Sequence, residues 1–232
     1  SEAEIIDAIT QADAEGTPVI VIGGGSNILA SDEPFDGVVV RDTRTEITEL
    51  MDDGCGGAEM RITAGTPWDD AVVFAVEHGW MGIEALSGIP GSVGAAPVQN
   101  IGAYGQELAE TLAAVRVYDR ATKATRTFFL SDMKFGYRDS ILKRSMGEFG
   151  ASPRWVVLSV DLHMRRATLS RPVSYVQLAN KLDIELGKRA PSADVRAAVL
   201  ELRRSKGMVL DDSDRDTYSL GSFFTNPVLT EE

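Results

Sequence analysis

Apolar and polar positions repeat with two different periods along this chain, which predicts a mixture of helices and strands. From residue 5 to residue 12 the apolar residues recur at three- and four-residue spacing, behind a capping box formed by Ser1 and Glu4. This pattern predicts an amphipathic helix at the N terminus. Short apolar or alternating runs predict strands over 18–22, 37–41, 59–63, 114–119, 125–129 and 155–162.

Capping signals predict three further helices. Thr66 is expected as the N-cap of the first, with Pro67 at its first position, Asp69 at its third and Gly79 at its end. Its predicted apolar face is Trp68, Val72, Val73 and Val76. The other two helices are expected to have Ser174 and Ser192 as their N-caps. Helices and strands in this order predict an α+β protein.

Composition and charge narrow the class of ligand. The 232 residues are 44% hydrophobic and 25% charged, which is ordinary for a globular protein, and no apolar run approaches a membrane span. We therefore expect a cytoplasmic location. A net charge of −12 argues against a nucleic-acid partner, because phosphate backbones are bound by basic surfaces. The single cysteine, Cys55, excludes an internal disulfide and a cysteine-based zinc site.

A glycine-rich segment spans residues 82–105 and carries almost no charge. Glycine lets backbone N–H groups approach a ligand closely, and successive N–H groups in tight turns form concave anion sites. An acidic protein needs such oriented amides to hold a phosphate, because its general field repels anions. The segment therefore predicts a site for a diphosphate-containing cofactor.

Two common phosphate-binding motifs do not account for these glycines. The run from Gly23 to Ile28 follows a predicted strand, but Ile28 replaces the third glycine of a dinucleotide fingerprint. The run from Gly88 to Gly94 lacks the Lys-Ser/Thr pair of a P-loop. Two glycine-rich candidates in one chain still favour a cofactor site more strongly than either alone.

Four motifs in order along the chain resemble the UDP-N-acetylenolpyruvoylglucosamine reductase family: 21–29 (VIGGGSNIL), 88–105 (GIPGSVGAAPVQNIGAYG), 135–143 (FGYRDSILK) and 221–227 (GSFFTNP). The resemblance implies a two-part FAD-binding fold (PCMH type, vanillyl-alcohol-oxidase superfamily) followed by an α+β substrate-binding domain. The implied boundaries are 1–47 for an N-terminally incomplete first subdomain, 48–168 for the second, and 169–232 for a C-terminally incomplete third part.

The same resemblance assigns residues to FAD, to catalysis and to substrate. FAD contacts are expected at Gly23, Gly25, Ser26, Asn27, Pro90, Gly91, Ser92, Gly94, Ala95, Gln99, Asn100, Gly102 and Tyr104. Arg138 corresponds to an active-site arginine and Ser222 to a proton-donating serine. Tyr175, Lys206 and Asn226 match residues that bind the UDP diphosphate. A catalytic glutamate that the family carries near its C terminus cannot be assigned to any residue here.

The implied reaction is NADPH-dependent reduction of a UDP-sugar enolpyruvyl ether in peptidoglycan synthesis, with FAD as the redox cofactor. Two alternatives stay open. One is another FAD oxidoreductase of the same superfamily; such enzymes often attach flavin to a histidine, and neither His78 nor His163 lies in a glycine loop. The other is a non-catalytic flavin- or nucleotide-binding module. The oligomeric state does not follow from the sequence.

Overall fold

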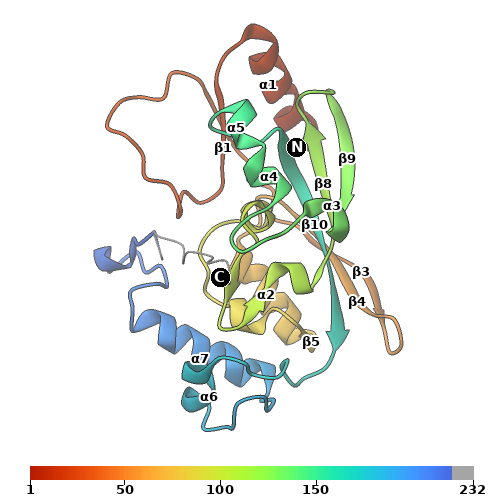
Figure 1. Cartoon of the computed structure of the whole chain (residues 1–232), viewed down its shortest axis with the longest axis vertical. Helices are drawn as coiled ribbons and strands as arrows, with labels where there is room; N and C mark the ends of the chain where they lie inside the picture. The colour runs from red at the N-terminus through yellow and green to blue at the C-terminus, as the bar shows by residue number, and fades with distance from the viewer. Residues whose placement is uncertain (221–232) are drawn as a thin grey trace, which may run out of the picture.

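The N-terminal unit of the protein is a helix packed on two strands. A computed structural model describes residues 1–220. Helix α1 (Glu2–Glu15) covers the parallel strands β1 (Val19–Ile22) and β2 (Val38–Arg41) (Figure 1). The predicted capping box at the start of α1 is present. Its buried face packs with residues of the main sheet, so the two parts share a core.

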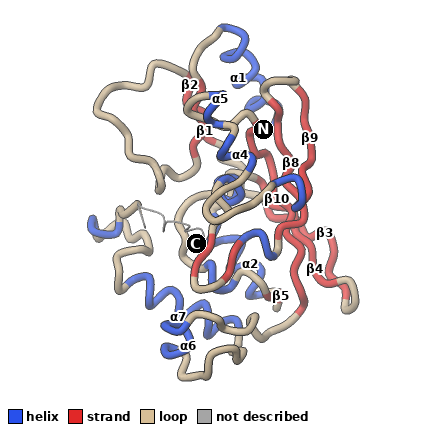
Figure 2. The backbone as a smooth tube through the Cα atoms, in the orientation of Figure 1, coloured by secondary structure: helices blue, strands red, loops and turns tan. Residues whose placement is uncertain are grey.

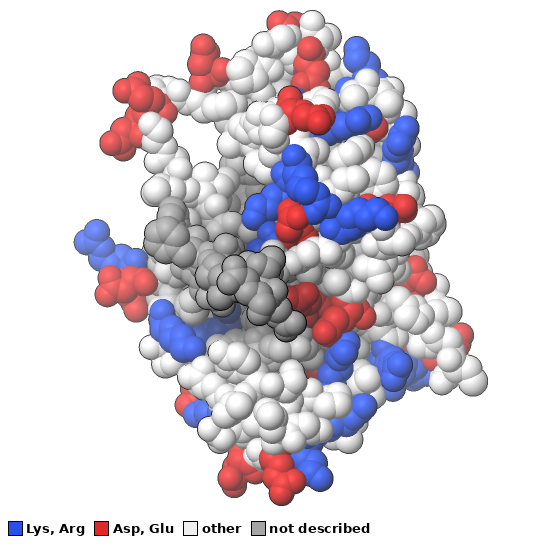
Figure 3. Space-filling model, viewed as in Figure 1, with Lys and Arg blue, Asp and Glu red and all other residues white. Residues whose placement is uncertain are grey.

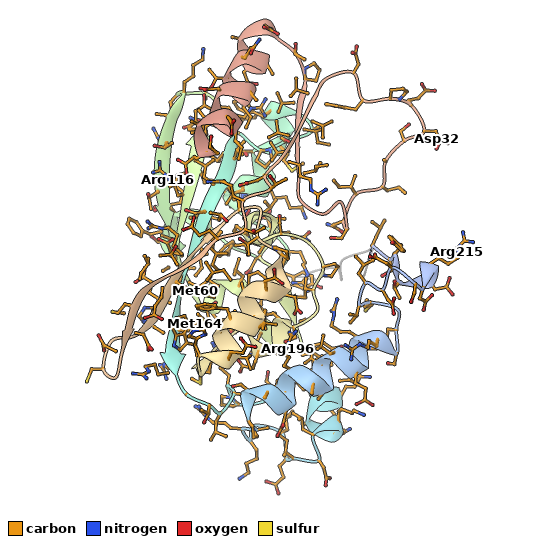
Figure 4. All side chains as sticks on the ribbon, turned by 180° about the vertical axis from the view of Figure 1, so that it is seen from behind. Asp32, Met60, Arg116, Met164, Arg196 and Arg215 are labelled. Carbon is orange, nitrogen blue, oxygen red and sulfur yellow. The ribbon has the colours of Figure 1, made fainter. Side chains whose placement is uncertain are left out.

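The loop between β1 and β2 extends away from the rest of the molecule. It begins in the glycine turn at 23–25 and carries Asp32 near its outer limit (Figure 4). Ile28, Leu29 and Phe35 of this loop are exposed. The middle of the loop therefore leaves apolar side chains exposed to solvent.

The main sheet has six strands in the order β3-β4-β10-β8-β9, with β5 pairing with β10 beside this path. All of its pairings are antiparallel. The strands are β3 (Ile47–Asp53), β4 (Gly57–Thr63), β5 (Trp80–Met81), β8 (Leu112–Asp119), β9 (Ala124–Phe129) and β10 (Trp155–Arg166).

Strand β10 joins the parts of this sheet. It pairs with β4 on one side, from Ser159 opposite Thr63 onward, and with β8 on the other. Its last two residues, Arg165 and Arg166, pair with β5. It is longer than the predicted strand at 155–162, and its C-terminal end leads toward the last helices of the chain.

Helix α2 (Trp68–Glu77) and the glycine-rich segment pack over one face of the sheet. The segment contains 3-10 helices η1 (Glu84–Leu86) and η2 (Val93–Val98), and its end and the residues after it form the short pair β6 (Gly102–Ala103) and β7 (Gln106–Glu107), then η3 (Leu108–Glu110). The largest core cluster lies between them and the sheet, and it includes Trp68, Met60 and Met164 (Figure 4).

The remaining helices lie at two places. Short helices α3 (Leu130–Met133), α4 (Ile141–Arg144) and α5 (Met146–Phe149) follow β9, whereas α6 (Val176–Lys181), α7 (Ser192–Arg204) and η4 (Arg215–Thr217) follow β10 (Figure 2). Helices α6 and α7 enclose their own cluster, which includes Val173, Leu178 and Val199.

All three predicted helix caps are wrong by one residue. Pro67, not Thr66, is the N-cap of α2, so that Asp69 is its second residue. Tyr175, not Ser174, is the N-cap of α6. Pro191, not Ser192, is the N-cap of α7, so that Ser192 is the first residue of that helix. None of these three caps uses a side-chain hydrogen bond. Thr66 Oγ1 instead lies 3.0 Å from Thr63 Oγ1.

The buried faces also differ in detail from the prediction. Ala71 and Ala75 of α2 are buried, whereas the predicted Val73 and Val76 are only partly so. Strand β3 was not predicted, because it is mostly exposed and carries acidic residues in place of an apolar pattern. Cys55 lies exposed in the β3–β4 turn, where we expected a turn residue.

Charged side chains of both signs are spread over the surface. Lys and Arg side chains gather around α4 on the face shown in Figure 3, which agrees with Lys143 and Arg144 in the last turn of that helix. Within residues 1–220, no helix has both the length and the apolar character that a membrane crossing requires.

Candidate flavin site

A cavity of about 530 Å³ lies where the glycine turn after β1 meets the glycine-rich segment. Strands β1 and β10 and the helices α4 and α5 also contribute to its walls. Mainly apolar side chains and backbone atoms line the cavity. The volume of the cavity is in the range of ligand pockets. Two segments more than 60 residues apart in sequence are thereby brought to one site, as the sequence predicted.

At some positions in the two loops, the walls of the cavity require a residue without a side chain. A Cβ at Gly94 would lie 2.6 Å from Ala64 Cβ and 3.1 Å from Ala64 Cα, so any larger residue would push the loop away from the sheet. A Cβ at Gly23 would lie 2.6 Å from Ser92 Oγ on the opposite loop. Gly91 has φ of 111°, a conformation that L side chains rarely adopt. These glycines keep backbone amides close to the cavity, which fits a ligand carrying a diphosphate.

Most of the residues predicted to contact FAD line this cavity. They are Gly23, Gly25, Ser26, Asn27, Pro90, Gly91, Ser92, Gly94, Ala95 and Gln99. The amide Nδ2 of Asn27 lies 3.5 Å from Gln99 Oε1, which places the two loops side by side. Contact of each residue with FAD stays a prediction, but the cavity brings these ten together.

Asn100, Gly102 and Tyr104 were also predicted to contact FAD, and they do not line the cavity. The Asn100 side chain is buried and serves the protein itself. Its Nδ2 donates to Glu107 Oε2 at 2.8 Å, and its Oδ1 accepts from Ala109 N–H at 3.0 Å. This asparagine orders the loop behind the cavity.

Arg138 lies against the end of the glycine-rich segment. One guanidinium nitrogen donates to the Gly102 carbonyl oxygen at 2.6 Å, and another lies 3.3 Å from the Asn100 carbonyl oxygen. Its backbone has φ of 52°, and its guanidinium carbon is 5.4 Å from the Tyr137 ring centroid. Arg138 is partly buried, so its planar fork is oriented by backbone acceptors while part of it stays accessible.

Two side-chain pairs near α6 and α7 lie outside the cavity lining: Tyr104 with Tyr175, and Gln177 with Lys206. These four residues are here called the α6–α7 cluster, which is distinct from the apolar core between the two helices. The Tyr104 and Tyr175 rings meet edge to face with centroids 5.4 Å apart. Burial raises the pKa of Tyr104, and nearby Tyr175 also raises it, while Arg203 opposes the shift. Lys206 Nζ donates to Gln177 Oε1 at 3.1 Å. The predicted substrate residues Tyr175 and Lys206 thus both lie in the part of the chain from 173 to 206, which contains both helices and is here called the α6–α7 unit.

Two functional candidates were missed from the sequence. Lys143 lines the cavity, and its Nζ donates to the Arg138 carbonyl oxygen at 3.0 Å. It is the last residue of the 135–143 motif, which was the available signal. Trp155 of β10 also lines the cavity, where it is partly buried and packs against the main core cluster.

No histidine or cysteine is among the lining residues in the part of the chain that the structure describes. His78 stacks on Phe74 with ring centroids 3.9 Å apart, as a structural side chain would. His163 lies exposed on β10. No group of three or more potential metal ligands occurs within residues 1–220. The predicted Ser222 and Asn226 lie outside the described residues.

Residues 1–127 match the family model described as FAD binding domain. This match covers more than half of the chain, and the chain belongs to the FAD binding domain family. FAD is therefore the cofactor that this family membership implies, and the cavity between the two glycine loops is the candidate site for it.

The particular relatives are reductases. The chain is 48% identical over 229 residues to UDP-N-acetylenolpyruvoylglucosamine reductase of Salinispora arenicola, covering 99% of this chain and 61% of that protein. For the protein of the same name from Thermobifida fusca the identity is 46%, over 100% of this chain and 63% of the relative. The resemblance inferred from the four motifs is thus confirmed. The chain spans about three fifths of the length of these relatives.

Solved structures agree with this placement. The crystal structure of UDP-N-acetylenolpyruvylglucosamine reductase from Thermus caldophilus matches with a TM-score of 0.60 at 25% identity, covering 94% of this chain and 64% of that chain. A solvent-stable cholesterol oxidase matches with a TM-score of 0.51 at 16% identity, over 73% of this chain and 34% of its own. The second match shows a shared fold alone, and both agree with the predicted FAD-binding architecture.

Proposed function

We propose that this protein is an NADPH-dependent flavoenzyme that reduces the enolpyruvyl ether of a UDP-sugar to UDP-N-acetylmuramate, a step of peptidoglycan synthesis. The observation that carries the proposal is the meeting of both family glycine loops at one cavity, in a chain 48% identical to such a reductase. Small molecules are then its partners: NADPH and the UDP-sugar. Cytoplasmic residence fits these partners.

In this proposal the chain divides the work between its parts. The segments 1–47 and 48–168 hold FAD, and 169–232 belongs to the part that holds the substrate. Bound FAD supplies the acceptance and donation of hydride. The chain's own residues then orient the substrate and stabilise the charge that develops on it.

Arg138 is proposed to bind the carboxylate of the enolpyruvyl group. Hydride addition to a carbon–carbon double bond next to a carboxylate places negative charge on that carboxylate. A guanidinium stays charged at any relevant pH and matches a carboxylate with two parallel hydrogen bonds. The contacts of Arg138 with the Gly102 and Asn100 carbonyl oxygens hold its fork in one orientation before substrate arrives.

Ser222 is proposed to give the proton that completes the reaction, and Tyr175, Lys206 and Asn226 to bind the diphosphate of the UDP group. A hydroxyl is a neutral donor and can act as general acid when its conjugate base is stabilised. Lys206 supplies a point charge for a phosphate. FAD is held without a covalent bond, because no histidine or cysteine lines the described cavity.

Spectra of the purified protein test the proposal. Flavin absorbance, its release into the supernatant on acid precipitation, anaerobic bleaching by NADPH, and reoxidation by the UDP-sugar enolpyruvyl ether are all expected. Covalently retained colour, or reoxidation by a different substrate alone, supports another FAD oxidoreductase of the superfamily. Bound flavin that NADPH does not bleach supports a non-catalytic flavin-binding module and contradicts the proposed activity.

A further inference from the structure

The glycine-rich segment at residues 82–105, here called the flavin loop, is hydrogen-bonded to α2 and α7 at the peptide groups of Gly88. Gly88 N–H donates to Asp69 Oδ1 at 2.7 Å, and its carbonyl oxygen accepts from Arg203 Nε at 3.1 Å. Asp69 is the second residue of α2, and Arg203 is near the end of α7. The polar groups of Gly88 are therefore held from both sides, and the next residues, from Ile89 on, line the flavin cavity.

Arg196 of α7 completes this contact. Its two terminal nitrogens donate to Asp69 Oδ1 at 2.7 Å and to Oδ2 at 2.6 Å, a two-point pairing between α2 and α7. Figure 4 shows Arg196 where these two helices approach each other. Its side chain is 18% exposed and that of Asp69 35% exposed, so water weakens the pair less than on an open surface.

The charge state of Asp69 fits this role. Burial favours its neutral form, but hydrogen bonds from Arg196 and from Gly88 N–H outweigh burial and lower the pKa of Asp69. Its carboxylate is therefore charged at neutral pH. It accepts from Gly88 and Arg196 at the same time.

Steric contact adds to the polar contacts at the same position. Gly88 has φ of 68°, and a Cβ there would lie 2.7 Å from Leu200 Cδ2 of α7. The backbone of the loop at Gly88 therefore packs closely against the Leu200 side chain of α7. Neither Asp69, Arg196 nor Arg203 lines the flavin cavity.

We propose that Asp69 and Arg196 are positioning residues for FAD: they fix the Gly88 peptide groups against α7 and thereby set the shape of the flavin loop from outside the cavity. The affinity for FAD then depends on the docking of the α6–α7 unit, which has no lining residue in the cavity. This inference needs FAD in the cavity and does not need the proposed reductase reaction.

The test is FAD affinity, measured on FAD-loaded full-length chain by dilution and recovery of free-flavin fluorescence, with neither NADPH nor a UDP-sugar present. Arg196→Gln is expected to weaken FAD binding about 10-fold, the loss of roughly one charge-assisted hydrogen-bonded pair. Arg196→Lys keeps the charge but not the two-point geometry, and about 3-fold weakening is expected.

The matched control is Glu201→Gln on the same helix. The Glu201 carboxylate pairs with Lys181 of α6 and not with the flavin loop. Glu201→Gln removes an ion pair between α6 and α7 without touching Gly88, so the FAD affinity of this variant should stay within two-fold of that of the unchanged protein. Thermal unfolding of all variants separates a loss of stability from a loss of FAD.

FAD affinity of Arg196→Gln within two-fold of the unchanged protein overturns the proposal, as does an equal loss in Glu201→Gln. If Arg196→Gln does not fold, Arg196→Lys decides: weakened FAD binding supports the proposal, and unchanged binding overturns it. If NADPH does not bleach the bound flavin, the proposed reductase activity is contradicted but the measured FAD affinities are unchanged. The two proposals can therefore be tested independently.

Discussion

The flavin cavity and the α6–α7 cluster differ in the share of backbone and side-chain atoms that form them. The phosphate-binding part of the cavity that we predict is formed by backbone and small residues of the two glycine loops, with Gly94 packed against Ala64 and Gly23 against Ser92. The cluster is formed by the ends of long side chains, such as the Tyr104–Tyr175 edge contact and the Lys206–Gln177 hydrogen bond. Backbone geometry is fixed when the chain folds, whereas exposed long side chains keep rotamer freedom until a ligand orders them. We therefore expect the first site to be formed in advance and the second to adapt.

The largest effect is expected at the most constrained cavity glycine. Gly94→Ala places a Cβ within 2.6 Å of Ala64 Cβ and close to its backbone, which cannot move away alone. Overpacking of this kind costs about 3 kcal/mol, equivalent to roughly 100-fold weaker FAD binding. Flavin fluorescence titration measures it. Gly54→Ala is the control, since a Cβ there meets nothing within 4 Å, and an equal loss there would contradict the prediction.

Arg138→Lys tests whether the planar geometry of the Arg138 side chain, and not its charge alone, is needed for substrate reduction. The lysine keeps the charge but cannot donate to the Gly102 and Asn100 carbonyl oxygens and to a carboxylate with a planar fork. Reoxidation of reduced flavin by the enolpyruvyl substrate should slow by about 10- to 100-fold, less than the roughly 10²–10³-fold cost of removing a preorganised donor outright, because lysine keeps the charge. Stopped-flow absorbance follows it, and the FAD content of the variant should stay normal. Unchanged reoxidation would remove Arg138 from the site.

Tyr175→Ala removes the ring that meets Tyr104 in the adaptable cluster. An aromatic pair contributes about 1 kcal/mol, so UDP binding should weaken by roughly 5-fold through loss of the ordered ring. Isothermal titration calorimetry with UDP measures it. FAD affinity should not change. If FAD affinity falls as far as UDP affinity, the two sites are not separate in the way described here.

Gly23→Ala should have the smallest effect and sharpens the first prediction. Its Cβ would meet Ser92 Oγ at 2.6 Å, and a hydroxyl can rotate away where the Ala64 backbone cannot. We expect FAD binding to weaken by about 3-fold, near the low end of overpacking costs. The same fluorescence titration compares it with Gly94→Ala. Equal effects of the two variants would show that rigidity of the opposing wall is not what decides the cost.

The parts of the site that could be predicted from the sequence are those that depend on backbone freedom. Glycine permits backbone conformations that other residues avoid, so the turn at Gly23 and the loop at Gly94 could each be predicted as anion-binding segments. The family resemblance predicted that both bind one cofactor, and they line one cavity. The cluster could be predicted only from the family resemblance. A tyrosine such as Tyr175 gives no local sign of which ring it will contact.

The errors have physical causes of the same kind. Strand β3 was missed because pairing with β4, not its own apolar pattern, holds it in the sheet. The caps at Thr66 and Ser192 were misplaced because a proline, with its fixed φ, took the capping position. The protein partners of Asn100, Glu107 and the Ala109 N–H, likewise depend on three-dimensional neighbours that no local pattern shows, while its contact with FAD stays a prediction.

Strand β10 lies in the middle of the sheet order but near the end of the sheet in sequence, and this has a consequence for how the protein is made. Strands β4 and β8 both pair with β10 and not with each other. Until residues 155–166 leave the ribosome, each of them therefore presents an unpaired edge. Contacts of such large sequence separation form slowly. The half-made sheet is the stage at which this chain is most exposed to aggregation, and the arrival of one strand ends it.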